Sequence, residues 1–382
     1  MIPYSRQSIS EHDIEEVIQV LRSDMITQGP INKKFEQEIC SYTTCKYSVL
    51  TNSATSALHL ACLALGLGPN DILWTSPNSY VASANAGLFC NAHVDFVDIN
   101  LETFNMCVKA LEEKLKLAEL NGKLPKIVMP VHFAGQSCDM VSISELAKKY
   151  GFRVIEDGSH AIGGKYLGEP IGSCTYSDIT VFSFHPVKII TTGEGGSAVT
   201  NDPSLFEKLK LLCSHGVTRD PNKMETETEN SWVYDQIILG FNYRMSDLNA
   251  ALGASQLKRI DEFTRRRHEI ARRYDEELSP SNLVTPYRDP KNYSALHLYP
   301  IQTYQRIQIF NWLQSQGIKV NVHYRPIHIQ PFWKKKGFLP GDFPNSETYY
   351  SKAISLPIHF NLTDDQQDKV CLLYTSPSPR DS

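Results

Sequence analysis

A regular exchange of strand-like and helix-like segments between about residues 45 and 200 restricts the fold more than any other feature of this sequence. The pattern of residues 47–71 predicts a strand, a polar turn and a helix, and residues 71–100 repeat that plan and add a second strand. Hydrophobic strands and helical segments go on alternating through residues 125–188. Parallel strands need crossover connections that are usually helices, so this order predicts an α/β fold with a mostly parallel sheet covered by helices.

The length of the chain and a change of pattern late in it predict a second, smaller domain. A chain of 382 residues exceeds what one hydrophobic core usually serves. A capped helix begins after Ser10, and one long helix is predicted from Ser246 to Leu278. Short alternating strands and an amphipathic helix follow. We therefore expect a large domain over residues 1–265, with the N-terminal helix included, and an α+β domain over residues 266–382.

Polar residues collect where the predicted strands end. The stretches are TNSAT, SPNSY, HFAGQ, EDGSH and FSFHPVK, each next to a hydrophobic run. In open α/β sheets, ligands bind at the carboxyl ends of the strands. One pocket can therefore collect all five stretches.

Lys188 lies in the last of these stretches, among aromatic, proline and glycine residues, with no other lysine or arginine near it. It is either a surface lysine whose stem lies along a strand edge or a partly desolvated amine. Burial lowers the pKa of an ammonium group, and a lysine with a lowered pKa is a nucleophile that can form a Schiff base with an aldehyde. Three glycines in the four positions 193–196 then predict a tight turn that lets the main chain come close to a ligand.

Pyridoxal phosphate, which carries an aldehyde, also needs a phosphate cup, a carboxylate and a flat contact, and the chain offers a candidate for each. Thr55 and Ser56 begin a predicted helix whose N–H groups favour an anion, although polar helix caps are common. Asp157 follows a hydrophobic strand and could keep the pyridine nitrogen protonated; a helix cap or a metal ligand is the alternative. His160 could lie over the ring or hold Asp157 in place, or be an ordinary loop histidine. Tyr80 could stack on the ring or be a core aromatic.

Composition and charge exclude several other classes of protein. Lys and Arg number 38 against 42 Asp and Glu, a formal charge of −4, and the basic run RRRHEIARR has helical spacing, so nucleic acid is not expected as a partner. No apolar run approaches the roughly 20 residues that span a bilayer, and the first residues lack the apolar core of a signal peptide, so we expect a soluble cytoplasmic protein. The nine cysteines are scattered without a C-x-x-C pair, so we expect reduced, mostly buried thiols and no metal site.

The motifs EDGSHAIGG, FSFHPVKIITTGEGGSAVTN and GFNYRMSDLNAALGASQL together resemble the DegT/StrS family of sugar-nucleotide aminotransferases, and the likeness runs from about residue 3 to 370. The resemblance implies pyridoxal 5′-phosphate as cofactor, the type I fold of enzymes that use it, and a homodimer with both active sites at the subunit interface. It also implies a role for each of the following residues: Lys188 binds the aldehyde carbon, Asp157 partners the pyridine nitrogen, Tyr80 stacks on the ring, His160 and Gln136 lie near it, and Ser183, Thr55, Ser56 and Asn242 of the other subunit bind the phosphate.

The reaction that the resemblance implies is transfer of an amino group from L-glutamate to C4 of a nucleotide-linked 4-keto-6-deoxy sugar. The stretches SHGVTRD and VHYRPIHIQPFW favour family members that act on a UDP-linked N-acetylhexosamine in pseudaminic acid synthesis. UDP-4-keto-arabinose, a dTDP sugar or a 3-keto sugar are the alternatives. Candidate substrate contacts, each with an ordinary loop or surface role as its alternative, are His215, Arg219, His323, Tyr324 and His328.

Three other functions fit parts of this pattern. A sugar dehydratase of the same fold replaces the lysine by histidine, and a regulatory protein that only binds the cofactor or a nucleotide sugar is expected to have lost one of the site residues. A dehydrogenase would have a G-x-G-x-x-G that opens a helix. Because Lys188, Asp157 and the phosphate cup are all present, the sequence favours a transaminase.

The chain departs from the family pattern at two places. Ile189 stands directly after the lysine where the family usually has proline, and both side chains fill apolar space. The last stretch, DDQQDKVCLLYTSPSPRDS, starts a capped helix at Thr363 and passes into a Ser/Pro-rich tail unlike anything in the family. We expect residues 371–382 to be foreign sequence whose deletion leaves the protein's behaviour unchanged.

Overall fold

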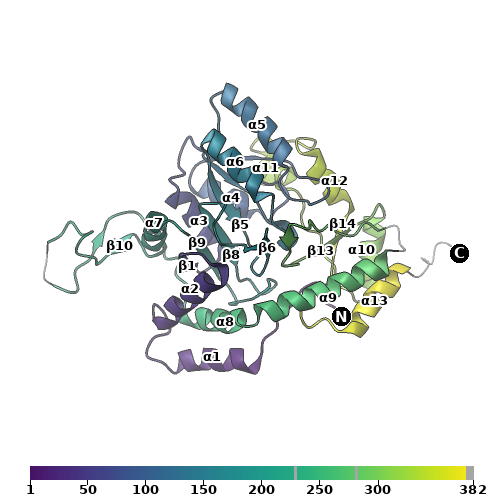
Figure 1. Cartoon of the computed structure of the whole chain (residues 1–382), viewed down its shortest axis with the longest axis horizontal. Coiled ribbons are helices and arrows are strands. Elements are labelled where there is room, and N and C mark those ends of the chain that lie inside the picture. Colours follow the sequence, from purple (N-terminus) through teal and green to yellow (C-terminus); the bar gives the residue numbers. More distant parts are fainter. Residues whose placement is uncertain (228–229, 280–282, 376–382) are drawn as a thin grey trace.

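A sheet of seven strands forms the centre of the molecule (Figure 1). The computed structural model describes residues 1–227, 230–279 and 283–375. The strands lie in the order β1, β9, β8, β5, β4, β2, β3, and β9 runs antiparallel to both β1 and β8 while the other pairs are parallel. Their bounds are β1 Tyr47–Thr51, β2 Ile72–Thr75, β3 His93–Phe96, β4 Ile127–Met129, β5 Arg153–Asp157, β8 Ile179–Ser183 and β9 Gly196–Thr200. The predicted α/β fold with a mostly parallel sheet is confirmed.

Helices cover both faces of the sheet because successive strand residues point to opposite sides. On one face, Ile155 and Val181 belong to a core shared with α3, α4 and α7. On the other face, Val154 packs with α5 and α6, and Phe182 packs with α2, α8 and the start of α9. The bounds of these helices are α2 Pro30–Thr43, α3 Ala54–Ala64, α4 Ala82–Phe89, α5 Val108–Leu120, α6 Met140–Tyr150, α7 Pro203–Cys213, α8 Asp247–Leu257 and α9 Ile260–Leu278.

The predicted N-terminal helix is α1 (Glu11–Leu21), and a capping box starts it. The Ser10 hydroxyl accepts the Asp13 N–H at 3.2 Å, and the Asp13 carboxylate accepts the Ser10 N–H at 2.8 Å. Asp13 is fully buried and also accepts hydrogen bonds from the side chains of Ser255 and Gln256. These bonds attach α1 to α8.

The single long helix expected from Ser246 onward is wrong, because the segment forms two helices. Ser246 caps α8 as predicted, but α8 ends at Leu257, and Arg259, at φ −106° and ψ 5°, precedes α9. The start of α9 packs through Phe263 into the core that contains Phe182, and its later turns pack through Ile270 into a separate core. The break lets one stretch of chain contact both cores, and no proline or glycine marks it in the sequence.

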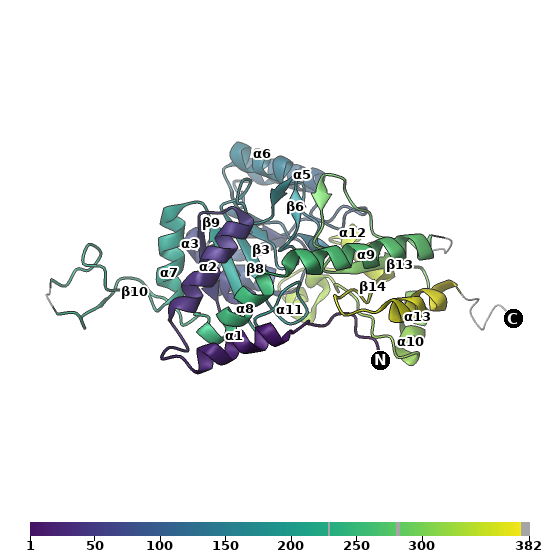
Figure 2. The ribbon, with the colours of Figure 1, turned by 60° about the horizontal axis from the view of Figure 1, so that its bottom comes forward.

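The C-terminal part of the chain forms a smaller α+β layer. Strands β13 (Tyr299–Gln302) and β14 (Ala353–Leu356) pair antiparallel, and α10 (Arg306–Ser315) packs with them. Ile2 joins this core and bridges to Ile318, so the N-terminus lies beside α10 and α13 (Figure 2). The remaining short elements are β6 Lys165–Tyr166, β7 Glu169–Pro170, β12 Asn292–Tyr293, η1 Phe133–Gly135, η2 Ile327–Ile329, α11 Pro331–Lys334 and α12 Pro344–Lys352.

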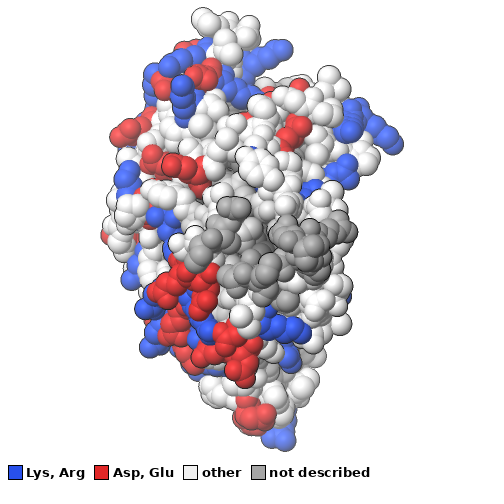
Figure 3. All heavy atoms as spheres, turned by 90° about the vertical axis from the view of Figure 1, so that its right-hand side faces the viewer, with Lys and Arg blue, Asp and Glu red and all other residues white. Residues whose placement is uncertain are grey.

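The last helix, α13 (Asp364–Thr375), continues past Val370. Arg266 of α9 pairs with Asp364 at 2.8 Å, and Figure 3, which faces this end of the molecule, shows acidic and basic side chains interspersed over it. Cys371 is 3% exposed and belongs to the small core. The first of the residues expected to be foreign is therefore packed into the protein, whereas residues 376–382 lie outside the described residues.

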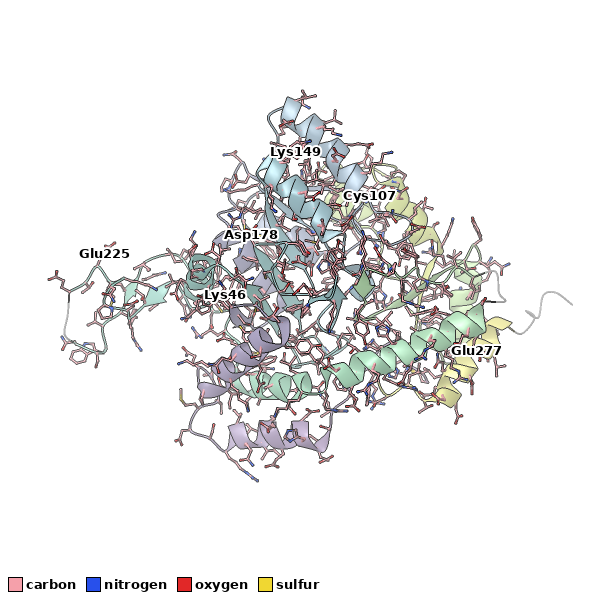
Figure 4. The ribbon with its side chains drawn as sticks, in the orientation of Figure 1. Lys46, Cys107, Lys149, Asp178, Glu225 and Glu277 are labelled. Atoms are coloured by element: carbon pink, nitrogen blue, oxygen red, sulfur yellow. The ribbon has the colours of Figure 1, made fainter. Side chains whose placement is uncertain are left out.

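A hairpin follows α7 and projects from the body of the molecule (Figure 1). Its strands are β10 (Val217–Thr218) and β11 (Asp235–Gln236), and Glu225 marks its outer part in Figure 4. Trp232 and Leu239 are 71% and 78% exposed. The hairpin therefore presents large apolar side chains to solvent.

Three expectations from composition concern the cysteines, membrane-spanning helices and metal sites of the described residues. The nine cysteines are free thiols, and all but Cys40 and Cys107 are buried. In the part of the chain that the structure describes, no helix combines the length and the hydropathy needed to cross a bilayer. Within the same residues, no three His, Cys, Asp or Glu side chains are grouped so that they could hold a metal ion.

Candidate active site

Three neighbouring strands bring the glycine turn next to the start of α3. Thr51 of β1 pairs with Gly196 of β9, and Gly196 pairs with Ser183 of β8. A Cβ atom on Gly196 would lie 2.5 Å from the backbone nitrogen of Ala54. Glycine is therefore required here because β9 passes against the first turn of α3, a contact within the chain that the glycine pattern alone did not reveal.

The start of α3 offers the donors that an anion needs. Ser53 caps the helix by accepting the Ser56 N–H at 3.1 Å, and the Ser56 hydroxyl donates to the side-chain oxygen of Asn52 at 2.6 Å. Within the described residues, the hydroxyls of Thr55 and Ser183 make no hydrogen bond to the protein. Ser183 lies on the sheet face that α3 covers, because it shares that face with Val181. Free hydroxyls and first-turn N–H groups thus meet at one point, as a phosphate group requires.

Asp157 ends β5 on the same face of the sheet. Its Oδ2 accepts from the Ser83 hydroxyl at 2.7 Å, and its Oδ1 accepts the Ser159 N–H at 3.1 Å. The residue is 4% exposed, so these two bonds fix the carboxylate. Each carboxylate oxygen can accept a further hydrogen bond, so the group can still receive one from a ring N–H.

Lys188 lies in the connection from β8 to β9, next to this carboxylate. Burial lowers its pKa to about 8, and the negative charge of Asp157 offsets part of that effect. The Ser5 hydroxyl donates to the Val187 carbonyl at 2.8 Å, and the Lys188 N–H donates to the His185 carbonyl at 2.9 Å. These bonds hold the lysine's loop. The amine is therefore desolvated and close enough to Asp157 to feel its charge, unlike a lysine on the surface.

Three buried histidines surround the amine. Burial and the charge of Lys188 hold the pKa of His160 well below its usual value and lower the pKa of His323 to about 3. The pKa of His297 is also lowered, by burial first and by its charged neighbours second, and its ring lies 4.4 Å from the His160 ring. All three imidazoles are therefore neutral. No sequence pattern pointed to His297, which comes from the segment before β13.

Within the described residues, one ring nitrogen of His160 is hydrogen-bonded and the other is not. Its Nε2 lies 3.1 Å from the Tyr324 hydroxyl, and within the described residues its buried Nδ1 has no hydrogen-bond partner. Such an unpaired buried atom is costly unless a ligand or water satisfies it. Tyr324 and His323 thus reach the site from the segment between α10 and η2.

Tyr80 lies at the open edge of this group. It is 64% exposed, and its ring centroid is 6.4 Å from that of Tyr324. A core aromatic would be buried, so that alternative is wrong. The ring is available to stack on a bound group.

Two candidates are already engaged within the protein. The side-chain oxygen of Gln136 accepts the Asp289 N–H at 2.9 Å, so this atom serves to hold a loop. His328 is fully buried, and its Nε2 lies 2.9 Å from the Glu347 carboxylate. The side chain of His328 therefore makes contacts inside the protein, and this argues against contact with a substrate.

Three further candidates are exposed and lie at or near the hairpin. His215 and Arg219 flank β10, and Asn242 bridges to Ser214 at the base of the hairpin. The next residue, Tyr243, accepts the Asn52 N–H through its carbonyl at 2.7 Å. Asn242 therefore stands beside the phosphate cup but is turned to the surface.

A desolvated lysine, a fixed aspartate and an anion cup at the ends of parallel strands are the groups that pyridoxal phosphate requires, and the fold and site together define an aminotransferase that uses it. The chain belongs to the DegT/DnrJ/EryC1/StrS aminotransferase family, whose sequence pattern matches residues 7–373. The expected family, enzyme class and cofactor are confirmed.

Similar proteins agree with this assignment. The UDP-4-amino-4,6-dideoxy-N-acetyl-beta-L-altrosamine transaminase of Campylobacter jejuni subsp. jejuni is 40% identical over 375 residues, which are 95% of this chain and 94% of that protein. Helicobacter pylori PseC, an aminotransferase involved in the biosynthesis of pseudoaminic acid, superposes with a TM-score of 0.88 at 31% identity and 98% coverage of both chains. The PLP-form of Spr1654 from Streptococcus pneumoniae gives a TM-score of 0.89 at 31% identity and the same coverage.

Proposed function

We propose that this aminotransferase moves an amino group from L-glutamate to C4 of a UDP-linked 4-keto-6-deoxy-N-acetylhexosamine, in nucleotide-sugar synthesis of the pseudaminic acid type. The observation that carries the proposal is the likeness to the Campylobacter jejuni transaminase, which extends over nearly the whole of both chains. The name of that relative specifies a UDP-linked 4-amino-4,6-dideoxy sugar.

The residues around Lys188 can perform the proton transfers that such a reaction needs. Bound pyridoxal phosphate supplies the electron sink through which an amino group is exchanged. With a pKa of about 8, the amine of Lys188 is neutral often enough near neutral pH to accept a proton from the substrate carbon and to return it. Asp157 would accept a hydrogen bond from the ring nitrogen of the bound group and so keep that nitrogen protonated. His160 is neutral and offers its free Nδ1 to the bound group.

Binding is assigned to groups at the two ends of the pocket. Thr55 and Ser183 would hold the phosphate through their free hydroxyls, and Ser56 would do so when its hydroxyl leaves Asn52. Gln136 would lie near the ring, and Tyr80 would stack on it. His323 and Tyr324 would meet the sugar nucleotide.

A homodimer would complete each site. Asn242 would reach the phosphate of the partner subunit, and His215 and Arg219 would reach its substrate. Large apolar side chains on the hairpin, such as Trp232 and Leu239, are exposed in one chain and suit an interface with a second copy. Sedimentation of the protein tests this, because a monomer would contradict the shared site.

The substrate proposal is tested with a set of 4-keto sugar nucleotides and L-glutamate, by measuring 2-oxoglutarate. Turnover with the UDP-linked 4-keto-6-deoxy-N-acetylhexosamine is expected to exceed turnover with UDP-4-keto-arabinose and with dTDP-linked sugars. Activity on a dTDP sugar alone would overturn the choice of substrate. Binding of pyridoxal phosphate without turnover of any sugar would favour a regulatory protein.

A further inference from the structure

A second buried carboxylate lies directly behind Asp157, on the opposite face of β5. Glu156 is 6% exposed and His132 is fully buried. The Glu156 Oε2 lies 2.7 Å from the His132 Nε2, and its Oε1 accepts from the hydroxyls of Ser177 and, at 3.1 Å, Thr180. None of these side chains has a role in the proposed reaction.

The hydrogen bonds define where the protons lie in this pair. The backbone N–H of Cys138 donates to the His132 Nδ1 at 3.2 Å, so this nitrogen carries no proton. The imidazole proton that faces Glu156 is then on Nε2 and is donated to the carboxylate. Burial raises the pKa of the Glu156 carboxyl, but hydrogen bonds from His132, Ser177 and Thr180 lower it by more, so the group is ionised. A buried carboxylate that accepts hydrogen bonds from three side chains is held in one position.

The Glu156 carboxylate lies next to backbone hydrogen bonds that hold Asp157. Beyond the end of β4, the Asp157 N–H donates to the Pro130 carbonyl at 2.9 Å, and the His132 N–H donates to the Asp157 carbonyl at 3.1 Å. The next residue, Phe133, contacts the His160 ring at 6.2 Å between centroids. The bond between Glu156 and His132 therefore connects the segment after β4 to β5. Asp157 and Phe133, which contacts His160, both lie next to this connection.

The same carboxylate reaches a third strand. Thr180 lies in β8, three residues before Ser183, and Ser177 lies just before that strand. Glu156 thus links the end of β5, which bears Asp157, to the beginning of β8, the strand that ends at the proposed phosphate contact Ser183.

We propose that Glu156 and His132 are positioning residues, which set the carboxylate of Asp157 against the ring nitrogen without touching the cofactor themselves. This inference rests on the role proposed for Asp157. If the pair is disturbed, the hydrogen bond from the ring nitrogen to Asp157 weakens, so the cofactor binds less tightly and its ring nitrogen becomes more acidic.

The test uses the full chain and pyridoxal 5′-phosphate, with two readouts besides activity. Glu156→Gln removes the charge but keeps the size, and His132→Phe removes both hydrogen bonds of the imidazole. His132→Gln keeps a donor for Glu156 and is the conservative variant. The readouts are the dissociation constant of the cofactor and the pH at which its ring nitrogen loses its proton, followed in the NMR spectrum of cofactor labelled with 15N at that atom. Glu169→Gln, an exposed carboxylate in β7, is the matched control, and Asp157→Asn is the positive control.

We expect Glu156→Gln and His132→Phe to weaken cofactor binding by about tenfold or more, since removal of outer partners of metal ligands costs about 10- to 100-fold. The spectral midpoint should move to lower pH, with His132→Gln between His132→Phe and the parent. Lys188 and Tyr324, the titratable groups on which the charge of Asp157 acts, are unchanged in these variants. A purely structural role would lower the melting temperature without moving the midpoint.

Unchanged affinity and midpoint in both variants, together with an effect of Asp157→Asn, would overturn this inference alone. No effect of Asp157→Asn would overturn the role of Asp157 as well, and with it the function proposed for the site. Should Glu156→Gln or His132→Phe not fold, Ser177→Ala provides the measurement, because it removes one of the three donors. In Ser177→Ala, the cofactor affinity and the pH midpoint should shift in the same direction as in the other variants and by less. No shift in either quantity would refute the positioning role.

Discussion

The amine of Lys188 should titrate far below an ordinary lysine, and this property can be measured without substrate. Burial brings its pKa to about 8 from 10.5. The difference of about 2.5 in pKa corresponds to about 3.4 kcal/mol against the charged form. At pH 7 about one tenth of the amine is neutral, against about one part in 3,000 for an unshifted lysine, an advantage of about 300-fold for reaction with an aldehyde.

Asp157→Asn should lower this pKa further. The carboxylate of Asp157 favours the ammonium form, so its removal leaves the desolvation of the amine unopposed. The assay is competitive trace acetylation of the cofactor-free protein across a pH series, with peptide mapping by mass spectrometry. Lys149, which lies exposed on α6 (Figure 4), is the internal reference. A midpoint near 10.5 for Lys188, or a rise of the midpoint in Asp157→Asn, would refute the reasoning.

Three further predictions concern stability and cofactor binding. Burial raises the pKa of Glu36 from 4.5 to about 7, so the folded state holds a proton that the unfolded chain releases, and stability falls as pH rises from about 4.5 to 7. Glu36→Gln should remove this fall and raise the free energy of unfolding at pH 8 by up to about 3 kcal/mol in urea titrations, and an unchanged pH dependence would contradict it. Gly196→Ala places a Cβ atom 2.5 Å from the Ala54 nitrogen and should cost about 1–3 kcal/mol of stability and weaken cofactor binding, whereas full retention of both would show that the turn can relax. Truncation after Val370 removes the buried Cys371 and should lower the melting temperature, whereas truncation after Thr375 should not; equal melting temperatures would show that Cys371 contributes nothing.

The sheet and the strand-end residues could be predicted from the sequence because their signals are local. Alternating hydrophobic and helical segments define strands and crossovers one at a time, and the rule that ligands bind at strand ends then gathers Thr55, Asp157, Ser183 and Lys188. The structure places Asp157 and Ser183 on one sheet face, Thr55 in the first turn of the helix that covers this face, and Lys188 in the connection that follows β8. Ser10 and Ser246 were likewise predictable as helix caps, since a cap depends on residues only three positions apart.

Other features depend on contacts between distant parts of the chain and left no signal in the sequence. His297 lies beside His160 although 137 residues separate them, and the bond from His132 to Glu156 joins two strands. The break at Arg259 reflects two cores that one helical pattern crosses without interruption. Helix α2 begins directly after Gly29, and within the described residues no side chain caps its start.

The account depends on one covalent partner for the cofactor aldehyde. Borohydride reduction of the protein loaded with pyridoxal 5′-phosphate, followed by peptide mapping, should place the phosphopyridoxyl group on Lys188, and Lys188→Ala should take up none. Label on another lysine, or an unlabelled protein, would contradict the assignment of the site.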